Sequence, residues 1–217
     1  MTNRQPKGTP VGGQFAEGRR PEGGDLASGT VQHVDFGRGP ISARRHLNPD
    51  GSEGGWVAET ATVDPTAFVG QDATVSEYAV VLRSAKVIDN AMVRGWSLVT
   101  GDATISGHAI IDNQAKVADN AVVSGHVTVV EHGLIHEDAH IDDSARIGGH
   151  ADIGGRAKVL GDAQVYGAAI VSGDATVLGD ATVCESSTVT GNAVVDGKSV
   201  VKGDTRLTSD GQRHWFK

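Results

Sequence analysis

Apolar residues recur every six positions along most of the chain, from Ala61 to Asp210, without an insertion or a deletion. In these 25 hexads the third residue is Val 18 times, Ile six times and Leu once, and the first residue is Ala 19 times. Alternate residues of a strand point to the same side, whereas a helix would need a 3.6-residue period, which is absent. The pattern therefore predicts short strands around a narrow core of small side chains.

The fifth and sixth residues of the hexads are those expected to turn the chain. The fifth is Gly 13 times, and the sixth is Asp or Asn 11 times. Gly and Asn accept the positive φ angles that sharp bends require. Each hexad is thus predicted to be a short strand followed by a bend.

This pattern resembles the hexapeptide-repeat superfamily, in which an aliphatic residue is followed four places later by a small one. The matching pairs run from Val63 with Ala67 to Val201 with Thr205, and the resemblance covers about 150 of 217 residues. It implies three hexads per triangular coil and left-handed winding, against the general preference for right-handed crossovers. Residues 61–210 are then expected to form an all-β, single-stranded left-handed parallel β-helix of about eight coils, spaced roughly 4.8 Å apart.

The rest of the chain divides into three segments. Residues 1–29 are rich in Gly, Pro and charge, so they are predicted to be a flexible arm that cannot bury enough apolar surface to order. Residues 30–60 contain two alternating stretches, 30–36 and 41–47, which predict a capping hairpin before a strand that leads into the repeats. A solenoid needs such a cap because its terminal coil otherwise exposes an apolar cross-section. Residues 211–217 form a short C-terminal tail.

Two further resemblances lie before the repeats. The segment EGGWV, Glu53–Val57, resembles a group of bacterial and phage proteins that carry GGW(V/I) before long A-x-V-x-G-D/N arrays. Those proteins are usually labelled acyltransferases on the repeat alone. The stretch RQPKGTPVGGQFA, Arg4–Ala16, is similar to a leader of unrelated actinobacterial and actinophage proteins. That similarity implies a recruitment or packaging tag, and hence a protein partner for the N-terminal arm.

Composition narrows the functional classes. The net charge of −8 and the pI near 5.5 disfavour non-specific binding to nucleic acid or to an anionic membrane. The single cysteine, Cys184, excludes an intrachain disulfide and fits a reducing compartment; at a fourth position it is expected to be a surface thiol. No apolar run reaches the length of a membrane span or a signal peptide. We expect a soluble cytoplasmic protein, virion-associated if the chain is phage-encoded.

Histidines are the first candidates for chemistry. Hexapeptide acyltransferases resemble one another in using a His as general base, and gamma-class carbonic anhydrases bind metal on the same coil through three His. Residues 18 apart stack in this fold, so His108 and His126 should form one pair and His132 and His150 another, at different corners. A two-His pair without a nearby carboxylate is a poor metal site. His126 and His132 are therefore candidate catalytic residues, with plain corner residues as the alternative.

The densest polar stretch is 131–143, in which His136 and His140 flank a corner that carries Glu137 and Asp138. This set is the candidate for a transition-metal site, and its two histidines are further catalytic candidates. The alternative is a solvated surface. We expect no cofactor.

The elements that build active sites in this superfamily are missing from the sequence. Hexapeptide acyltransferases resemble one another in a loop extruded from a coil and a helix after the last coil, which form the acyl-CoA groove between subunits of a trimer. The 25 hexads contain no inserted loop. We therefore favour a non-enzymatic structural or interaction module that presents flat faces. The alternative is an acyltransferase-like enzyme with a site between subunits.

One face of the expected triangle carries more outward apolar side chains than the others. Superfamily members resemble one another in trimerising through such a face, so a homo-oligomer is expected, with a trimer as the first hypothesis. The residues on this face are Val80, Leu82, Leu98, Leu134 and Ile170.

Overall fold

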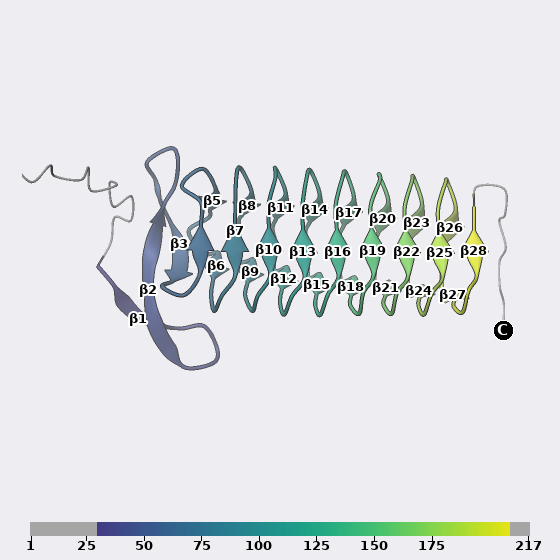
Figure 1. Cartoon of the computed structure of the whole chain (residues 1–217), viewed down its shortest axis with the longest axis horizontal. Coiled ribbons are helices and arrows are strands. Elements are labelled where there is room, and N and C mark those ends of the chain that lie inside the picture. Colours follow the sequence, from purple (N-terminus) through teal and green to yellow (C-terminus); the bar gives the residue numbers. More distant parts are fainter. Residues whose placement is uncertain (1–29, 209–217) are drawn as a thin grey trace, which may run out of the picture.

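The protein is a rod of stacked parallel coils with an N-terminal cap (Figure 1). The structure, a computed structural model, describes residues 30–208. The expectations for the arm 1–29 and the tail 211–217 lie outside the described residues, as do the last two residues of the final hexad. Within residues 30–208 every element is a strand, and the predicted left-handed parallel β-helix of about eight coils is confirmed.

Three sheets form the sides of the rod, and we call their outward surfaces faces A, B and C. Sheet A consists of β1 (Gln32–Asp35), β2 (Pro40–Leu47), β3 (Glu53–Ala58), β6 (Thr74–Val75), β9 (Met92–Val93), β12 (Ile110–Ile111), β15 (Thr128–Val129), β18 (Arg146–Ile147), β21 (Gln164–Val165), β24 (Thr182–Val183) and β27 (Val200–Val201). Sheet B consists of β4 (Thr62–Val63), β7 (Val80–Val81), β10 (Leu98–Val99), β13 (Lys116–Val117), β16 (Leu134–Ile135), β19 (Asp152–Ile153), β22 (Ile170–Val171), β25 (Thr188–Val189) and β28 (Arg206–Leu207). Sheet C consists of β5 (Phe68–Val69), β8 (Lys86–Val87), β11 (Thr104–Ile105), β14 (Val122–Val123), β17 (His140–Ile141), β20 (Lys158–Val159), β23 (Thr176–Val177) and β26 (Val194–Val195).

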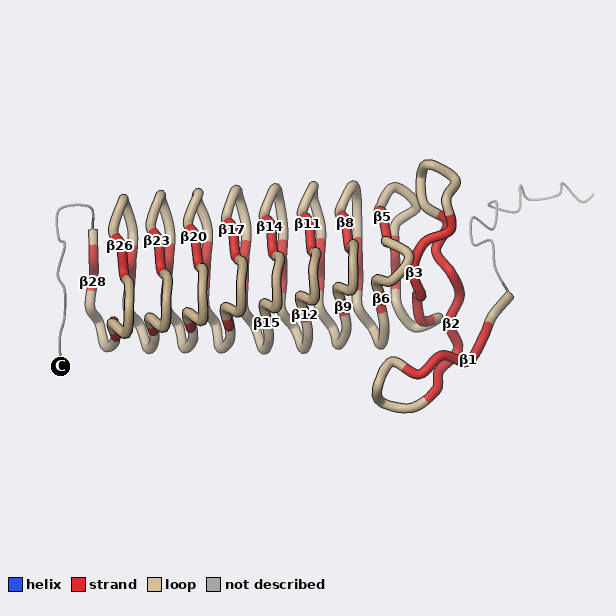
Figure 2. Tube along the Cα trace, turned by 180° about the vertical axis from the view of Figure 1, so that it is seen from behind, coloured by secondary structure: helices blue, strands red, loops and turns tan. Residues whose placement is uncertain are grey.

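The coils are joined by backbone hydrogen bonds in a constant register. Each strand of the helix pairs in parallel with the strand 18 residues further on, as Leu98 pairs with Lys116. The same spacing repeats on all three sides, so the coils stack evenly when the rod is seen from behind (Figure 2). At most corners a backbone hydrogen bond closes a tight turn, as where the Ala67 N–H donates to the Asp64 carbonyl at 2.9 Å. The sequence period of six is thus the length of one side of the triangle.

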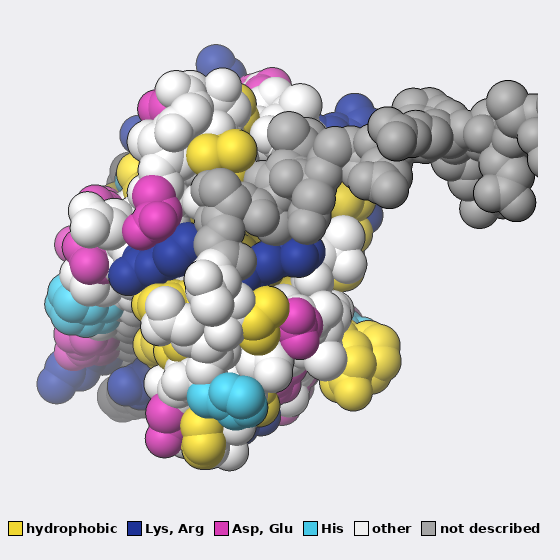
Figure 3. Space-filling view, turned by 90° about the vertical axis from the view of Figure 1, so that its left-hand side faces the viewer, with side chains coloured by type: hydrophobic (Ala, Val, Ile, Leu, Met, Phe, Trp, Pro, Cys, Tyr) yellow, Lys and Arg dark blue, Asp and Glu magenta, His cyan; other side chains and the backbone are white. Residues whose placement is uncertain are grey.

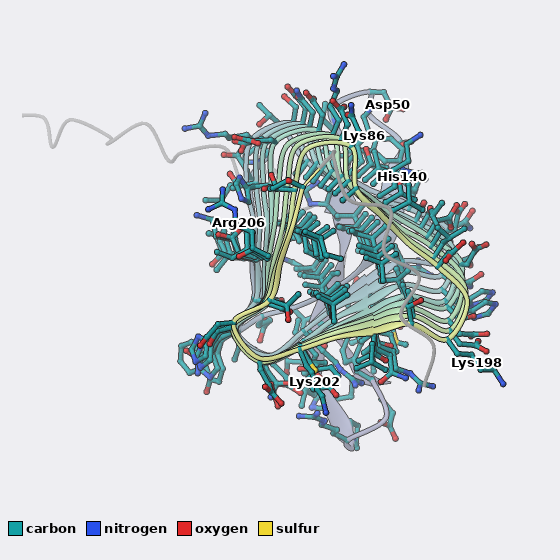
Figure 4. All side chains as sticks on the ribbon, turned by 90° about the vertical axis from the view of Figure 1, so that its right-hand side faces the viewer. Asp50, Lys86, His140, Lys198, Lys202 and Arg206 are labelled. Atoms are coloured by element: carbon teal, nitrogen blue, oxygen red, sulfur yellow. The ribbon has the colours of Figure 1, made fainter. Side chains whose placement is uncertain are left out.

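The core is a column of small side chains inside the triangle. Figure 4 shows these side chains in aligned rows, with Lys202 outside face A, Arg206 outside face B and His140 outside face C. The third-position Val and Ile from Val69 to Val189 are almost fully buried, as are the first-position Ala residues between them. Each such Val or Ile contributes about 1.5–2 kcal/mol through burial.

The cap extends sheet A beyond its first coil. Strands β1 and β2 form the predicted antiparallel hairpin, β2 pairs antiparallel with β3, and β3 pairs in parallel with β6. The guanidinium of Arg45 lies 4.4 Å from the Trp56 ring centre, which couples β2 to β3. Figure 3 shows Lys and Arg side chains together across this end of the rod.

The edge of sheet C that faces the cap is closed by side chains of the cap, chiefly Asn48. The Asn48 Oδ1 accepts from the Val69 N–H at 2.8 Å, and its Nδ2 donates to the Val69 carbonyl at 3.1 Å. Asn48 is 4% exposed, so its amide replaces the pairing that a further strand would supply. His46 Nε2 donates to the Ala67 carbonyl on the same edge, and burial lowers the pKa of His46 below its ordinary value.

The turn between β1 and β2 is tied back to the coils. Arg38 reaches Glu77 at 2.8 Å and Asp112 at 3.5 Å, and Asp112 also pairs with Arg94 at 2.8 Å. Asp112 is 7% exposed, and a buried carboxylate requires such partners. The hairpin is therefore anchored to the side of the rod at face A.

Residues 30–208 include no helix with the length and apolarity to cross a membrane.

The inward and outward positions of one strand should tolerate charge very differently. We expect Val123→Asp to destabilise the rod by at least about 4 kcal/mol, because it buries a carboxylate without a partner. The neighbouring Val122 points outward, so Val122→Asp should cost less than about 1 kcal/mol. Urea unfolding followed by circular dichroism measures both, and equal losses would contradict the assigned core.

The side-chain amide of Asn48 should contribute more to the stability of the rod than exposed side chains near it do. We expect Asn48→Ala to cost about 2–3 kcal/mol, because it leaves both backbone groups of Val69 without a partner in a buried place. Lys86→Ala, an outward change on the adjacent strand β8, should stay within about 0.5 kcal/mol of the native chain. Hydrogen exchange at the Val69 amide localises the effect; unchanged protection in Asn48→Ala would rule out this role.

Candidate functional site

The four residues of the candidate metal site belong to different surfaces. His136 lies on face B and His140 on face C, with Glu137 and Asp138 at the corner between them. Each has a partner of its own. The Glu137 carboxylate accepts from the Gly155 N–H, and Asp138 Oδ1 accepts from Asn120 Nδ2 at 2.9 Å.

The two histidines are each engaged on their own face. His136 Nε2 lies 2.8 Å from Asp152 Oδ1, and its ring occupies the space above Gly154, where a Cβ atom would lie 2.6 Å from the imidazole. His140 Nε2 lies 3.7 Å from Asp142 Oδ2. The Asp143 N–H donates to Asp142 Oδ1 and holds the pKa of Asp142 below its ordinary value. These are two separate His–Asp pairs.

No metal centre forms from these groups. Throughout residues 30–208, no three His, Cys, Asp or Glu side chains are grouped so that they could hold an ion. A stable transition-metal site needs several converging ligands, usually four for zinc. In this structure the four candidate groups of the 131–143 stretch lie on two faces and a corner and do not converge on one point.

The structure confirms the two stacked histidine pairs. The rings of His108 and His126 are parallel with centres 4.8 Å apart, and those of His132 and His150 lie 4.6 Å apart. Among the described residues, neither His126 nor His132 forms an ion pair or a side-chain hydrogen bond. A general base needs an orienting partner and a proton within reach. In this structure, His126 and His132 are thus stacked corner residues without an orienting side-chain partner among residues 30–208.

A third stack stands on the corner between faces A and B. The rings of Tyr78 and Trp96 lie 4.3 Å apart and nearly parallel, and both are exposed, Trp96 by 67%. Offset stacking stabilises such pairs by roughly 0.5–1.5 kcal/mol beyond burial. The corner thus carries a rigid aromatic ridge.

Acidic residues at the fifth position accept hydrogen bonds from backbone N–H groups at the corners. Asp143 adopts a φ of 62°, and its Oδ2 accepts from the N–H of Gly161, one coil further on, at 2.8 Å. The same kind of hydrogen bond, from a backbone N–H of the following coil, is accepted by the carboxylates of Asp89, Asp119, Glu131, Glu137 and Glu185. The sequence analysis did not predict this role, and it named Glu137 only as a candidate metal ligand. The signal that could have identified them is an acidic residue at a fifth position, because the N–H from which it accepts lies 18 residues further along the chain.

The expectation of a surface thiol at Cys184 is wrong. Its side chain lies in the fourth-position row of face A, between Tyr166 and Lys202, and the residue is only 5% exposed. Hydrogen bonding to the Cys184 thiol raises the pKa of the Tyr166 phenol. Fourth-position side chains point outward but are covered by their larger neighbours in the row, which the repeat pattern does not reveal.

Two hollows interrupt the flat faces, and sequence analysis identified neither. One, of about 330 Å³, lies on face B beside Ala118, Leu134 and His136. The other, of about 520 Å³, lies on face A at Gly148, between Val130 and Tyr166. In each case a small fourth-position residue has larger neighbours 18 residues away, and this contrast is the signal in the sequence.

The capping role of the corner acids can be measured at Asp143. Asp143→Asn should be nearly neutral, because the amide keeps an acceptor and Asn tolerates positive φ. Asp143→Gly should cost about 1 kcal/mol through the lost hydrogen bond, and Asp143→Ala more, because Ala adds strain at this φ. Thermal unfolding gives the order; a Gly variant as stable as the native chain would show that the cap is worth nothing.

Comparison with known proteins adds no further constraint. No family model matches the chain, and no curated protein sequence matches it either.

Proposed function

We propose that this chain is a non-enzymatic structural or interaction rod that associates with copies of itself through face B, as a trimer. The observation that carries the proposal is the uninterrupted coil: from Thr62 to Leu207, every strand follows the last at six-residue spacing. An unbroken solenoid offers extended flat surfaces, and those are suited to association. The resemblance to the hexapeptide-repeat superfamily supports the trimer.

Face B has the composition of an interface. Its outward side chains Val80, Leu98 and Leu134 are half-buried, and Ile170 is 42% exposed. Trp96 stands at the edge of this face, two residues before Leu98. Large aromatic residues surrounded by apolar surface are typical anchors of protein interfaces. A threefold assembly joins two different surfaces of each copy, so the aromatic ridge of one subunit can meet face B of the next.

The alternative, an acyltransferase-like enzyme, has less support. Its candidate histidines are stacked on each other or paired with single carboxylates, as described above, and no loop leaves the described coils.

We further propose that the rod acts in the cytoplasm or, if phage-encoded, in the virion, with the N-terminal arm as a tether to a protein partner. The single cysteine and the acidic composition support an intracellular site.

The association can be tested with a matched pair of outward substitutions. The native chain, of 22.4 kDa, should elute with three times that mass in light-scattering chromatography. Leu98→Glu should yield monomers, because it places a charge in the apolar face, whereas Thr104→Glu, at the same strand position on face C, should leave the trimer intact. Circular dichroism controls for folding. A native monomer at tens of micromolar contradicts self-association.

The non-enzymatic part has a separate test. The native protein should show no transfer from acetyl-CoA to a panel of amine and hydroxyl acceptors, and no coenzyme A binding by calorimetry. Turnover that disappears in His126→Ala or His132→Ala would replace this proposal with the enzyme.

A further inference from the structure

The hollow on face A has the features of a small-ligand site and lies away from the proposed interface on face B. Its volume of about 520 Å³ falls within the range of ligand pockets, roughly 300–1,000 Å³. The lining is mostly apolar, with a few polar groups along one rim.

The hollow exists because Gly148 has no side chain. It occupies the fourth position between Val130 and Tyr166, and its backbone is not in the left-handed region. A Cβ atom there would make ordinary contact with Val130 Cγ2, at 3.4 Å. At Gly154, by contrast, the same atom would collide with His136. The fold therefore does not require glycine at 148, and a larger residue would simply fill the space.

The hollow has two apolar walls. Val130 stands on one side and Tyr166, 44% exposed, on the other. The Tyr166 ring offers an aromatic surface on which a flat ligand can stack.

The polar rim carries an available cation. Arg146 is exposed and forms no ion pair within residues 30–208, and it stands between Thr128 and Gln164 in the same row. The other charged group of the lining is Glu131, whose carboxylate accepts from the Gly149 N–H and has its Oε2 3.7 Å from the place of a Gly148 Cβ atom. Of these two charges, the Arg146 guanidinium is the one that can attract an anion.

We propose that this hollow binds a small organic anion with a flat apolar body, an aromatic or alicyclic carboxylate. The body lies over Gly148 between Val130 and Tyr166, and the carboxylate pairs with Arg146, whose planar fork matches it bidentately. Thr128 and Gln164 offer further donors beside the guanidinium.

The test uses the full-length protein with 2-naphthoate as the probe and 2-naphthamide as its neutral counterpart, by saturation-transfer NMR and calorimetry. The native chain should bind naphthoate more tightly than naphthamide. Arg146→Gln should weaken naphthoate about 10-fold and leave naphthamide unchanged, because only the charge-assisted hydrogen bond is lost. Gly148→Leu should abolish binding of both, while Ser172→Leu, which also places leucine at a fourth position but on face B, should bind like the native chain.

Three results would overturn the proposal. The first is that the native chain binds neither probe, or binds both equally. The second is that Gly148→Leu binds naphthoate as the native chain does, which would place the ligand elsewhere. The third is that Gly148→Leu, folded by circular dichroism, loses self-association, which would make the hollow a contact between copies of the chain. Because the probes address face A and Leu98→Glu addresses face B, the two proposals can fail separately.

Discussion

The rod depends on backbone hydrogen bonds between successive coils, in which an N–H donates to the carbonyl 17 positions further along the chain. Each strand of the coil has only two residues, so no strand is stable alone and each is held by the coils before and after it. The narrow interior accepts Ala at the first position and Val or Ile at the third, because larger side chains would push the coils apart. Stability accumulates through neighbour contacts, as in other solenoids.

Two devices satisfy the backbone groups that this stacking leaves without a partner. At the N-terminal end the Asn48 amide pairs with both backbone groups of Val69. Along the corners, fifth-position carboxylates such as Asp143 accept from the N–H of the next coil. In both cases a polar side chain completes the hydrogen bonding where a strand edge or a bend prevents the backbone from doing so. Much of the acidic charge of the chain is therefore structural.

Functional differences in such a rod have to come from its rows of outward side chains. Face B carries a row of apolar side chains, and the ridge of Tyr78 and Trp96 borders it, which suits the proposed association. Face A contains the hollow at Gly148, with Arg146 at its rim. The histidines, which are the expected carriers of chemistry, are instead stacked in pairs or bound to single carboxylates. These features are the basis on which we propose a role in recognition.

The sequence by itself determined the coil, because a strict period of six allows only one arrangement of inward and outward residues. It also located the two stacked histidine pairs, since residues 18 apart must be neighbours. Only the tertiary structure decided that Cys184 is covered and that His136 pairs with Asp152 rather than facing His140 across a corner. It also revealed the hollow at Gly148. These features depend on the sizes and rotamers of neighbours on adjacent coils, and a repeat pattern specifies the direction of a side chain but not the space around it.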